Sequence, residues 1–168
     1  MTSPDRSADL RQNNRRDIVR SQQWWGHKIP PVLAIAAIAV GERGVVARDL
    51  RDLLLLMVSM AGVAAFGHLV NDLSDVEADA RGGKVNLVAE VPTAARVRLV
   101  GGSLVLGVVP WCWLPARDLA RWALVAEVVL LVVYSVPPFR LKARGLPGVL
   151  ADATYAYAAP FVLVMFLF

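Results

Sequence analysis

The chain lacks the residues on which several classes of protein depend. Its single cysteine, Cys112, cannot form an internal disulfide, so a disulfide scaffold is excluded. Charged residues make up only 19% of the 168 positions, whereas a typical soluble domain has roughly 25%. No basic stripe marks a water-soluble face despite the net charge of +4, which argues against a soluble nucleic-acid-binding protein. We also find no internal repeat, no low-complexity tract and no soluble second domain.

What the chain has in excess is apolar sequence. Hydrophobic residues make up 57% of it and the mean hydropathy is +0.51, which argues against disorder. A membrane-crossing helix needs about 20 mostly apolar residues. We therefore expect an all-α transmembrane helical bundle of about five spans, at residues 24–41, 53–70, 99–114, 119–136 and 149–168. The alternative, a soluble helical core, would leave too little polar surface to cover such runs.

The first apolar run follows a polar, arginine-rich segment. We expect residues 1–23 to form a cytoplasmic tail and residues 24–168 to form the membrane domain. A basic leader before an apolar core is also typical of a secretory signal peptide. The leader is long, however, and no clear small-residue cleavage site follows, so we favour a retained span. This span is the weakest of the five, because Lys28 and two prolines lie within it.

Basic residues predict which loops face the cytoplasm. Thirteen of the 18 Lys and Arg residues lie in segments 1–28, 71–98 and 137–148, which alternate with the other connections. Because cytoplasmic loops carry the excess of positive charge, we expect the N-terminus and these two loops to be cytoplasmic. The C-terminal end then lies on the far side. High alanine, valine, arginine and glycine content suggests a GC-rich bacterial source. We therefore expect an integral protein of a bacterial-type cytoplasmic membrane.

An acidic segment, residues 71–79, begins where the second span ends. If the helix continues, Asp72, Asp75 and Asp79 lie within about 60° on one face, with His68 on that face and Asn71 at its edge. Carboxylates on one stripe repel each other without a counter-ion. Mg²⁺ takes oxygen ligands and often binds phosphates as well. The stripe therefore predicts a Mg²⁺–diphosphate platform at the mouth of the bundle, and a solvated acidic loop is the alternative.

Side chains that could bind phosphate oxygens lie in both cytoplasmic loops. Lys84 and Asn86 follow the acidic segment. In the second loop a proline pair stops the fourth span, and three basic residues then alternate: Arg140, Lys142 and Arg144. An extended segment would present all three on one side, where they could bind the oxygens that Mg²⁺ leaves uncovered. Positive-inside anchoring explains the same charges, and from charge alone it is the better explanation.

Ionisable residues also lie inside the predicted spans, where they are functional candidates by default. Glu127 lies midway along the fourth span, with Tyr134 on the same helical face. Asp152 lies early in the fifth span, with Tyr155 about one turn later. We expect these side chains to line a common cavity. Hydrogen bonding between helices is the alternative for both carboxylates.

Two segments carry a family resemblance. NDLSDVEAD, residues 71–79, matches the N-D-x-x-D-x-x-x-D motif of the UbiA-type intramembrane prenyltransferases. YSVPPFRLK, residues 134–142, resembles the Tyr-Ser-x-Pro-Pro-x-Arg-x-Lys segment of that family. Both lie at predicted span ends on the same side of the membrane. The chain resembles roughly the N-terminal half of a family member, which has about nine spans.

The resemblance implies Mg²⁺-dependent transfer of a prenyl group from a polyprenyl diphosphate to an acceptor. The acceptor would be an aromatic, quinone-type molecule or a lipid precursor. By position, the metal ligands would be Asp72, Asp75 and Asp79. The catalytic set would be Asp72, Asp75 and Tyr134. Asn71, Ser135, Arg140 and Lys142 would bind the diphosphate, and Lys84 joins them on its position in the loop.

One departure from the family concerns its second aspartate-rich motif, for which this chain has no counterpart. We therefore expect an incomplete prenyltransferase domain: a truncated product, a partial sequence, or a half-length protein that pairs with itself or with a second-half partner. Two other functions remain open. The chain could be a non-catalytic membrane subunit that binds a lipid diphosphate, or a small transporter fragment with Glu127 and Asp152 on an ion path.

Overall fold

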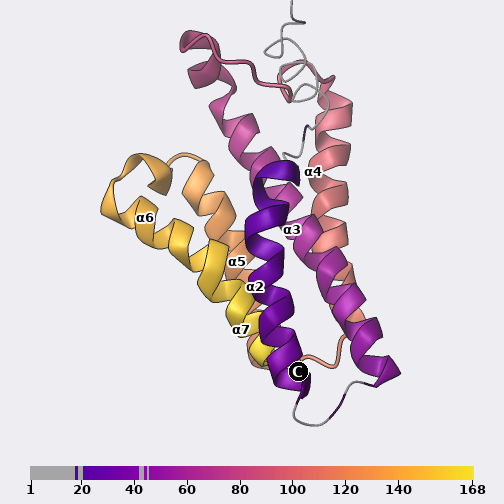
Figure 1. Cartoon of the computed structure of the whole chain (residues 1–168). Coiled ribbons are helices and arrows are strands. Elements are labelled where there is room, and N and C mark those ends of the chain that lie inside the picture. The colour runs from indigo at the N-terminus through magenta and orange to yellow at the C-terminus, as the bar shows by residue number, and fades with distance from the viewer. Residues whose placement is uncertain (1–17, 19–20, 42–43, 45) are drawn as a thin grey trace, which may run out of the picture.

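Every described element of the chain is helical (Figure 1). The computed structural model describes residues 18, 21–41, 44 and 46–168, without the side chains of 22–25, 27 and 28. Most of the predicted tail, and the Lys28 side chain, therefore lie outside the described residues. The elements are α2 Ser21–Gly41, α3 Ala47–Arg81, α4 Thr93–Val108, η1 Val109–Cys112, α5 Asp118–Ser135, η2 Leu141–Ala143, α6 Leu146–Ala153, η3 Thr154–Ala158 and α7 Ala159–Met165. The prediction of an all-α fold is confirmed.

Three helical stretches are long and apolar enough to cross a membrane. They are Ala47–Arg81, Thr93–Cys112 and Leu146–Met165. Three such stretches indicate an integral membrane protein. Helix α5 has 18 residues but carries three charged side chains. In α2 the apolar helix found among the described side chains is Ile29–Gly41. The expectation of spans is thus confirmed for three helices, and the total of five stays a prediction.

Helix α3 is the longest element and carries the acidic segment as its last turns. Its 35 residues correspond to a length of about 52 Å, whereas the hydrocarbon core of a bilayer is about 30 Å thick. The helix begins where the Val46 backbone N–H donates to Asp49 Oδ2 over 3.0 Å, and it continues to Arg81. The predicted helical continuation through residues 71–79 is therefore confirmed, and the aspartates share one face of α3.

Helices α3 and α4 approach each other closely where both carry glycine. A Cβ added at Gly62 would overlap the backbone nitrogen of Gly107, so a side chain at this position would force the helices apart. Beside this crossing the Trp111 indole N–H donates to Ser59 Oγ over 2.7 Å, and the Ser59 hydroxyl donates to the Gly107 carbonyl over 2.5 Å. Small residues and interhelical hydrogen bonds are typical of helix pairs in membranes.

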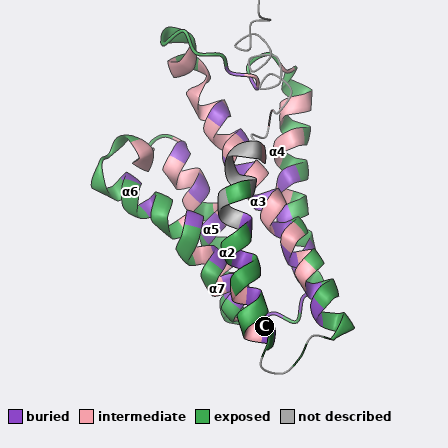
Figure 2. Cartoon of the chain, viewed as in Figure 1, coloured by how far each residue is buried: buried purple, intermediate pink, exposed green. Residues whose placement is uncertain are grey.

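The other helices complete a bundle with a largely apolar outer surface. Helix α5 packs against α3 and α7, and α2 packs against α7. Large apolar side chains remain exposed on the outer faces of α2, α4 and α5, among them Ile38, Val97 and Trp122 (Figure 2). Surfaces of this kind are rare on soluble monomers and suit contact with lipid.

Candidate functional site

The two motifs that resemble the family segments lie against each other in the fold. Arg140 Nη2 lies 2.7 Å from Asp75 Oδ1, and Lys142 Nζ lies 2.6 Å from Asp75 Oδ2. Each oxygen of this carboxylate thus binds one cation. Arg140 and Lys142 are 65 and 67 residues further along the chain than Asp75. Charge-assisted bonds of this length are the strong ones, so they hold the α5–α6 connection on the last turns of α3.

Lys142 makes further contacts with the same face of α3. Its ammonium donates to Asn71 Oδ1 over 2.8 Å and to Ser74 Oγ over 3.2 Å, in addition to Asp75. An ammonium group has three N–H donors, and here all three are used. Ser135 adds a long contact, 3.5 Å from its hydroxyl to the same Asn71 oxygen. We call this group the charged cluster: Asn71, Ser74, Asp75, Ser135, Arg140 and Lys142.

The loop that carries the basic residues is not extended, so this expectation was wrong. A turn follows α5, Arg140 has left-handed backbone angles (φ 39°, ψ 56°), and the 3-10 helix η2 comes next. The chain therefore changes direction between successive basic residues. Arg140 and Lys142 both reach Asp75, whereas the exposed Arg144 donates to the carbonyl oxygen of Pro138 over 2.8 Å.

The other two aspartates of the stripe have different surroundings. Asp72 is buried, with 3% of its surface exposed. Asn86 Nδ2 donates to Asp79 Oδ2 over 3.0 Å and to the backbone oxygen of Asp72 over 2.8 Å. Asn86, predicted to meet phosphate oxygens, therefore holds the loop after α3 against the helix end. Lys84 lies in that loop with its side chain exposed, and its predicted role in binding diphosphate stays a prediction.

The predicted metal ligands do not form a ready metal centre in this arrangement. Within the described part of the chain, no group of three His, Cys, Asp or Glu residues could hold a metal ion. Asp75 is paired with two cations and Asp79 accepts a hydrogen bond from Asn86. These two carboxylates would have to give up protein partners before they could bind Mg²⁺, and the cofactor stays a prediction.

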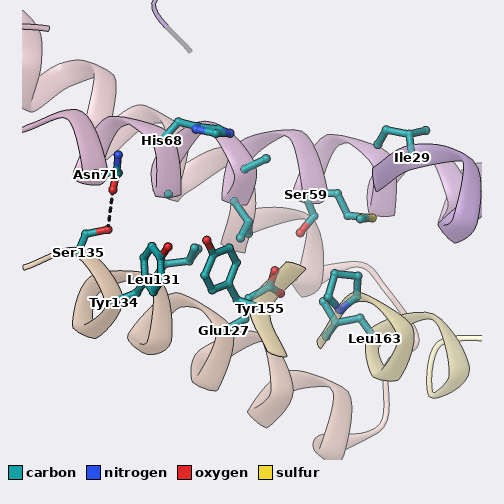
Figure 3. A pocket seen from close by; sticks show the side chains of 15 residues that line it. Ile29, Ser59, His68, Asn71, Glu127, Leu131, Tyr134, Ser135, Tyr155 and Leu163 are labelled. Atoms are coloured by element: carbon teal, nitrogen blue, oxygen red, sulfur yellow. Dashed lines mark hydrogen bonds between the residues drawn. The ribbon is translucent and has the colours of Figure 1, made fainter. Parts of the chain in front are cut away.

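A cavity of about 210 Å³ begins beside the charged cluster and runs between the helices (Figure 3). At its polar end lie His68, Asn71, Tyr134 and Ser135. The rest of the lining is mainly apolar and comes from α2, α3, α5 and the η3–α7 stretch: Ile29, Ser59, Met60, Val63, Ala64, Gly67, Glu127, Leu131, Tyr155, Pro160 and Leu163. The cavity therefore suits a molecule with a polar head and an apolar body.

Three of the four in-span residues expected to share a cavity do so. Glu127, Tyr134 and Tyr155 line it. The Tyr134 and Tyr155 rings are neighbours and pack edge to face, with 5.2 Å between their centroids and an interplanar angle of 68° (Figure 3). Asp152 is exposed and does not line the cavity, although it accepts a hydrogen bond from the Tyr155 hydroxyl. The expectation was wrong for Asp152, because its side chain is exposed and is not among those that line the cavity.

The lining residues Met60, Val63 and Gly67 were missed from the sequence. A signal existed, because they recur on α3 at helical spacing with His68 and Asn71 and include small residues. The π-helix η3, Thr154–Ala158, was missed too, and it carries Tyr155 toward the cavity. Short π-helical insertions are frequent at functional sites.

Comparison with known proteins provides no relative for this chain. No family model, curated protein or solved structure matches it. The charged cluster and the adjacent cavity are therefore the features of the chain that point to a function.

Proposed function

We propose that this chain binds a polyprenyl diphosphate and takes part in transferring its prenyl group to an acceptor, as part of a UbiA-type intramembrane prenyltransferase. One observation carries the proposal: a cluster of cations and hydrogen-bonding side chains lies at the polar end of a mainly apolar cavity. A prenyl diphosphate has the matching shape and polarity, with an anionic head and a hydrocarbon tail.

The diphosphate would bind at the charged cluster. The Arg140 side chain is 36% exposed, so its guanidinium can reach a ligand at the cavity mouth while it stays near Asp75. A guanidinium can bind two phosphate oxygens at once, which would also orient the head group. Lys142 would have to give up a present partner before it could bind phosphate, because its three donors are in use.

The prenyl tail would lie in the cavity, with its first carbon beside Tyr134. When the carbon–oxygen bond breaks, its electron pair leaves with the diphosphate and the allylic carbon becomes cationic. An aromatic ring stabilises a nearby cation, and exclusion of water protects it. An acceptor carbon or oxygen then forms the new bond to the allylic carbon and loses its own proton to the released diphosphate. Tyr134 and its neighbour Tyr155 are the rings in position for this. An aromatic, quinone-type molecule or a lipid precursor is the proposed acceptor class.

Membrane orientation completes the proposal. Five spans, a cytoplasmic N-terminus and a site open to the cytoplasm would place the charged cluster where a water-borne or interfacial diphosphate can reach it. Mg²⁺ remains the proposed cofactor on the grounds of the aspartate stripe. Its requirement needs a direct test, because Asp75 is already paired with two cations.

The test is binding of labelled farnesyl diphosphate to the full chain in detergent, with release of diphosphate measured in the same samples and with Mg²⁺ or EDTA present. We expect Asp75→Ala and Asp72→Ala to weaken binding at least tenfold. Glu77→Ala is the matched control, because Glu77 is an exposed carboxylate on the same turns of α3. Unchanged binding in both aspartate variants would contradict the proposal.

The same assay separates the enzyme from a non-catalytic subunit, since a subunit would bind without releasing diphosphate. The samples with EDTA test the cofactor. If diphosphate binding is unchanged in EDTA, then Mg²⁺ is not needed for binding. The ion-path alternative stays open and has its own test. It predicts that Glu127→Gln changes ion flux, and equal flux in this variant and the parent would count against it.

A further inference from the structure

One acidic side chain lies in a membrane-length apolar stretch, outside both the charged cluster and the cavity lining. Asp152 is the single charged residue of Leu146–Met165, one of the three stretches that could cross a membrane. An ionisable side chain costs free energy at such a place, so residues of this kind typically mark a function and have an identifiable partner. Asp152 is exposed, so burial within the described bundle does not explain it. Its role must therefore come from the bond that it makes.

The partner of Asp152 is the hydroxyl of Tyr155, which donates a hydrogen bond to Asp152 Oδ1. Residues three positions apart on a helix are neighbours on its surface, so an exposed carboxylate can reach the hydroxyl of a side chain that lines the cavity. Tyr155 belongs to η3, is half-buried and lines the cavity. The bond thus connects a carboxylate outside the cavity with an aromatic ring of the cavity wall.

Tyr155 is restrained at two points. Asp152 holds its hydroxyl, and its ring packs edge to face with Tyr134. Figure 3 shows the two rings next to each other at the cavity, Tyr134 from α5 and Tyr155 from η3. A tyrosine side chain has only two torsions that move its ring, so these two restraints together select one ring orientation.

The orientation of the rings matters for a reaction that passes through a cation. The face of an aromatic ring is negative and its edge is positive, so a cation is attracted to the face and repelled by the edge. Tyr134 is the ring beside which the allylic cation is proposed to form, and Tyr155 is the ring that packs against it. A Tyr155 ring that turned freely would present its face to the cation only part of the time and would leave Tyr134 without a fixed neighbour.

We propose that Asp152 is a positioning residue: its bond to the Tyr155 hydroxyl fixes the Tyr155–Tyr134 ring pair in the orientation that stabilises the allylic cation. This inference rests on the proposed function and adds a residue that acts on the reaction without touching the substrate. Asp152 serves only as a hydrogen-bond acceptor, and no proton is transferred. A side chain that accepts at the same place, such as the amide oxygen of asparagine, should therefore replace it.

The first experiment measures two quantities for the full chain in detergent with Mg²⁺: the dissociation constant of farnesyl diphosphate and the single-turnover rate of diphosphate release. Asp152→Ala and Tyr155→Phe remove the bond from its two sides. Each should lower the rate at least fivefold and leave the dissociation constant within twofold of the parent, whereas a general structural defect would weaken binding as well. Asp152→Asn should keep the rate within twofold of the parent. A rate as low as that of Asp152→Ala would overturn the positioning role.

Tyr155→Phe keeps the ring, so it carries the test if Asp152→Ala does not fold. Because both changes break the same bond, the double variant should be within twofold of the slower single variant. Losses that multiply would show that Asp152 acts elsewhere and would overturn the proposal.

Thr154→Val is the matched control. Thr154 is the exposed neighbour of Tyr155, and its hydroxyl donates to the Leu150 carbonyl over 2.7 Å, so the variant loses a hydroxyl bond of the same turn and keeps the bond of Asp152. Its rate should equal that of the parent. A loss as large as that of Asp152→Ala would assign the effect to the helical turn and overturn the proposal.

A second measurement does not depend on turnover. The chain has three tyrosines, Tyr134, Tyr155 and Tyr157, so incorporation of fluorotyrosine gives fluorine resonances that single Tyr→Phe variants can assign. Asp152→Ala should shift the resonances of Tyr155 and Tyr134 and leave that of the exposed Tyr157 in place. Unshifted resonances of Tyr155 and Tyr134 would overturn the proposal. Failure of the proposed function looks different, since the parent would release no diphosphate while the shifts caused by Asp152→Ala would remain.

Discussion

At the scale of single residues, Asp75 and Lys142 hold the site together. Their side chains are 19% and 15% exposed, so the ion pair is neither fully screened by water nor deeply buried. Pairs of this kind contribute more than surface salt bridges, because removing one partner leaves the other poorly solvated. Arg140 remains on the other oxygen of Asp75, which limits the loss when Lys142 is removed.

Replacing Lys142 by Met should lower the free energy of unfolding by about 2 kcal/mol, because three charge-assisted or hydroxyl bonds disappear together. Unfolding of the detergent-solubilised chain by denaturant titration measures this. The control Lys84→Met changes an exposed lysine in the loop between α3 and α4 and should stay within about 0.5 kcal/mol of the parent. Additive effects of Lys142→Met and Asp75→Asn in the double variant would refute their coupling.

Tyr134 offers a second prediction at this scale, one that depends on the proposed function. If its ring stabilises an allylic cation, Tyr134→Phe should retain most of the turnover and Tyr134→Leu should lose about tenfold, since a cation–π contact of about 1.4 kcal/mol corresponds to that factor. Single-turnover rates at saturating farnesyl diphosphate measure the chemical step. Equal rates for the two variants would exclude a role for the ring.

At the scale of helices, α3 and α4 cross so closely that their contact requires glycine. Among the described glycines, an added Cβ at Gly62 would lie nearest to another atom, the backbone nitrogen of Gly107. Ser59 and Trp111 lie beside it and contribute buried hydrogen bonds to the same pair of helices. The crossing also borders the cavity, because Ser59 lines it. Damage to this helix pair is therefore expected to affect ligand binding as well as stability.

Gly62→Ala should destabilise the chain by about 2 kcal/mol, because its Cβ meets backbone rather than a movable side chain. Gly102→Ala on α4 is the matched control. It has open space around it, so added helix propensity should leave stability unchanged or raise it by about 0.5–1 kcal/mol. Thermal unfolding in detergent compares the two, and equal effects would argue against the close crossing.

At the scale of the whole molecule, membrane orientation is the main prediction still open. Three apolar helical stretches indicate a membrane protein, and the basic residues predict which side each loop faces. Cys112 is exposed and is the single cysteine of the chain, so it can report on one side without further engineering. It follows α4, at the end of the bundle predicted to lie outside the cytoplasm.

A membrane-impermeant maleimide applied to intact bacterial spheroplasts should label Cys112. In the Cys112→Ser/Glu90→Cys variant, labelling should require permeabilisation, because exposed Glu90 lies in the predicted cytoplasmic loop. The reversed pattern would invert the orientation and move the charged cluster to the outer side. Labelling of both sites without permeabilisation would show that the span between them does not cross the membrane.

The sequence was sufficient for features that depend on neighbours along the chain. Apolar run length predicted the helices, and helical periodicity predicted the aspartate stripe on α3, because both are properties of one continuous segment. The partners of that stripe were harder to predict from the sequence. Arg140 and Lys142 were expected to act beside the stripe from the second loop, together with Arg144. The turn that separates them from Arg144 could not be predicted from their spacing.

What the sequence alone determined is an all-helical, membrane-type chain with an acidic face at the end of its longest helix. What only the tertiary structure decided is how that face is used. Arg140 and Lys142 bind the two oxygens of Asp75, and Asn86 holds the loop after α3. Helix α5 packs on α3 at Gly67, and both helices line the cavity. These outcomes depend on distances between residues far apart in the sequence, and packing of the helices sets those distances.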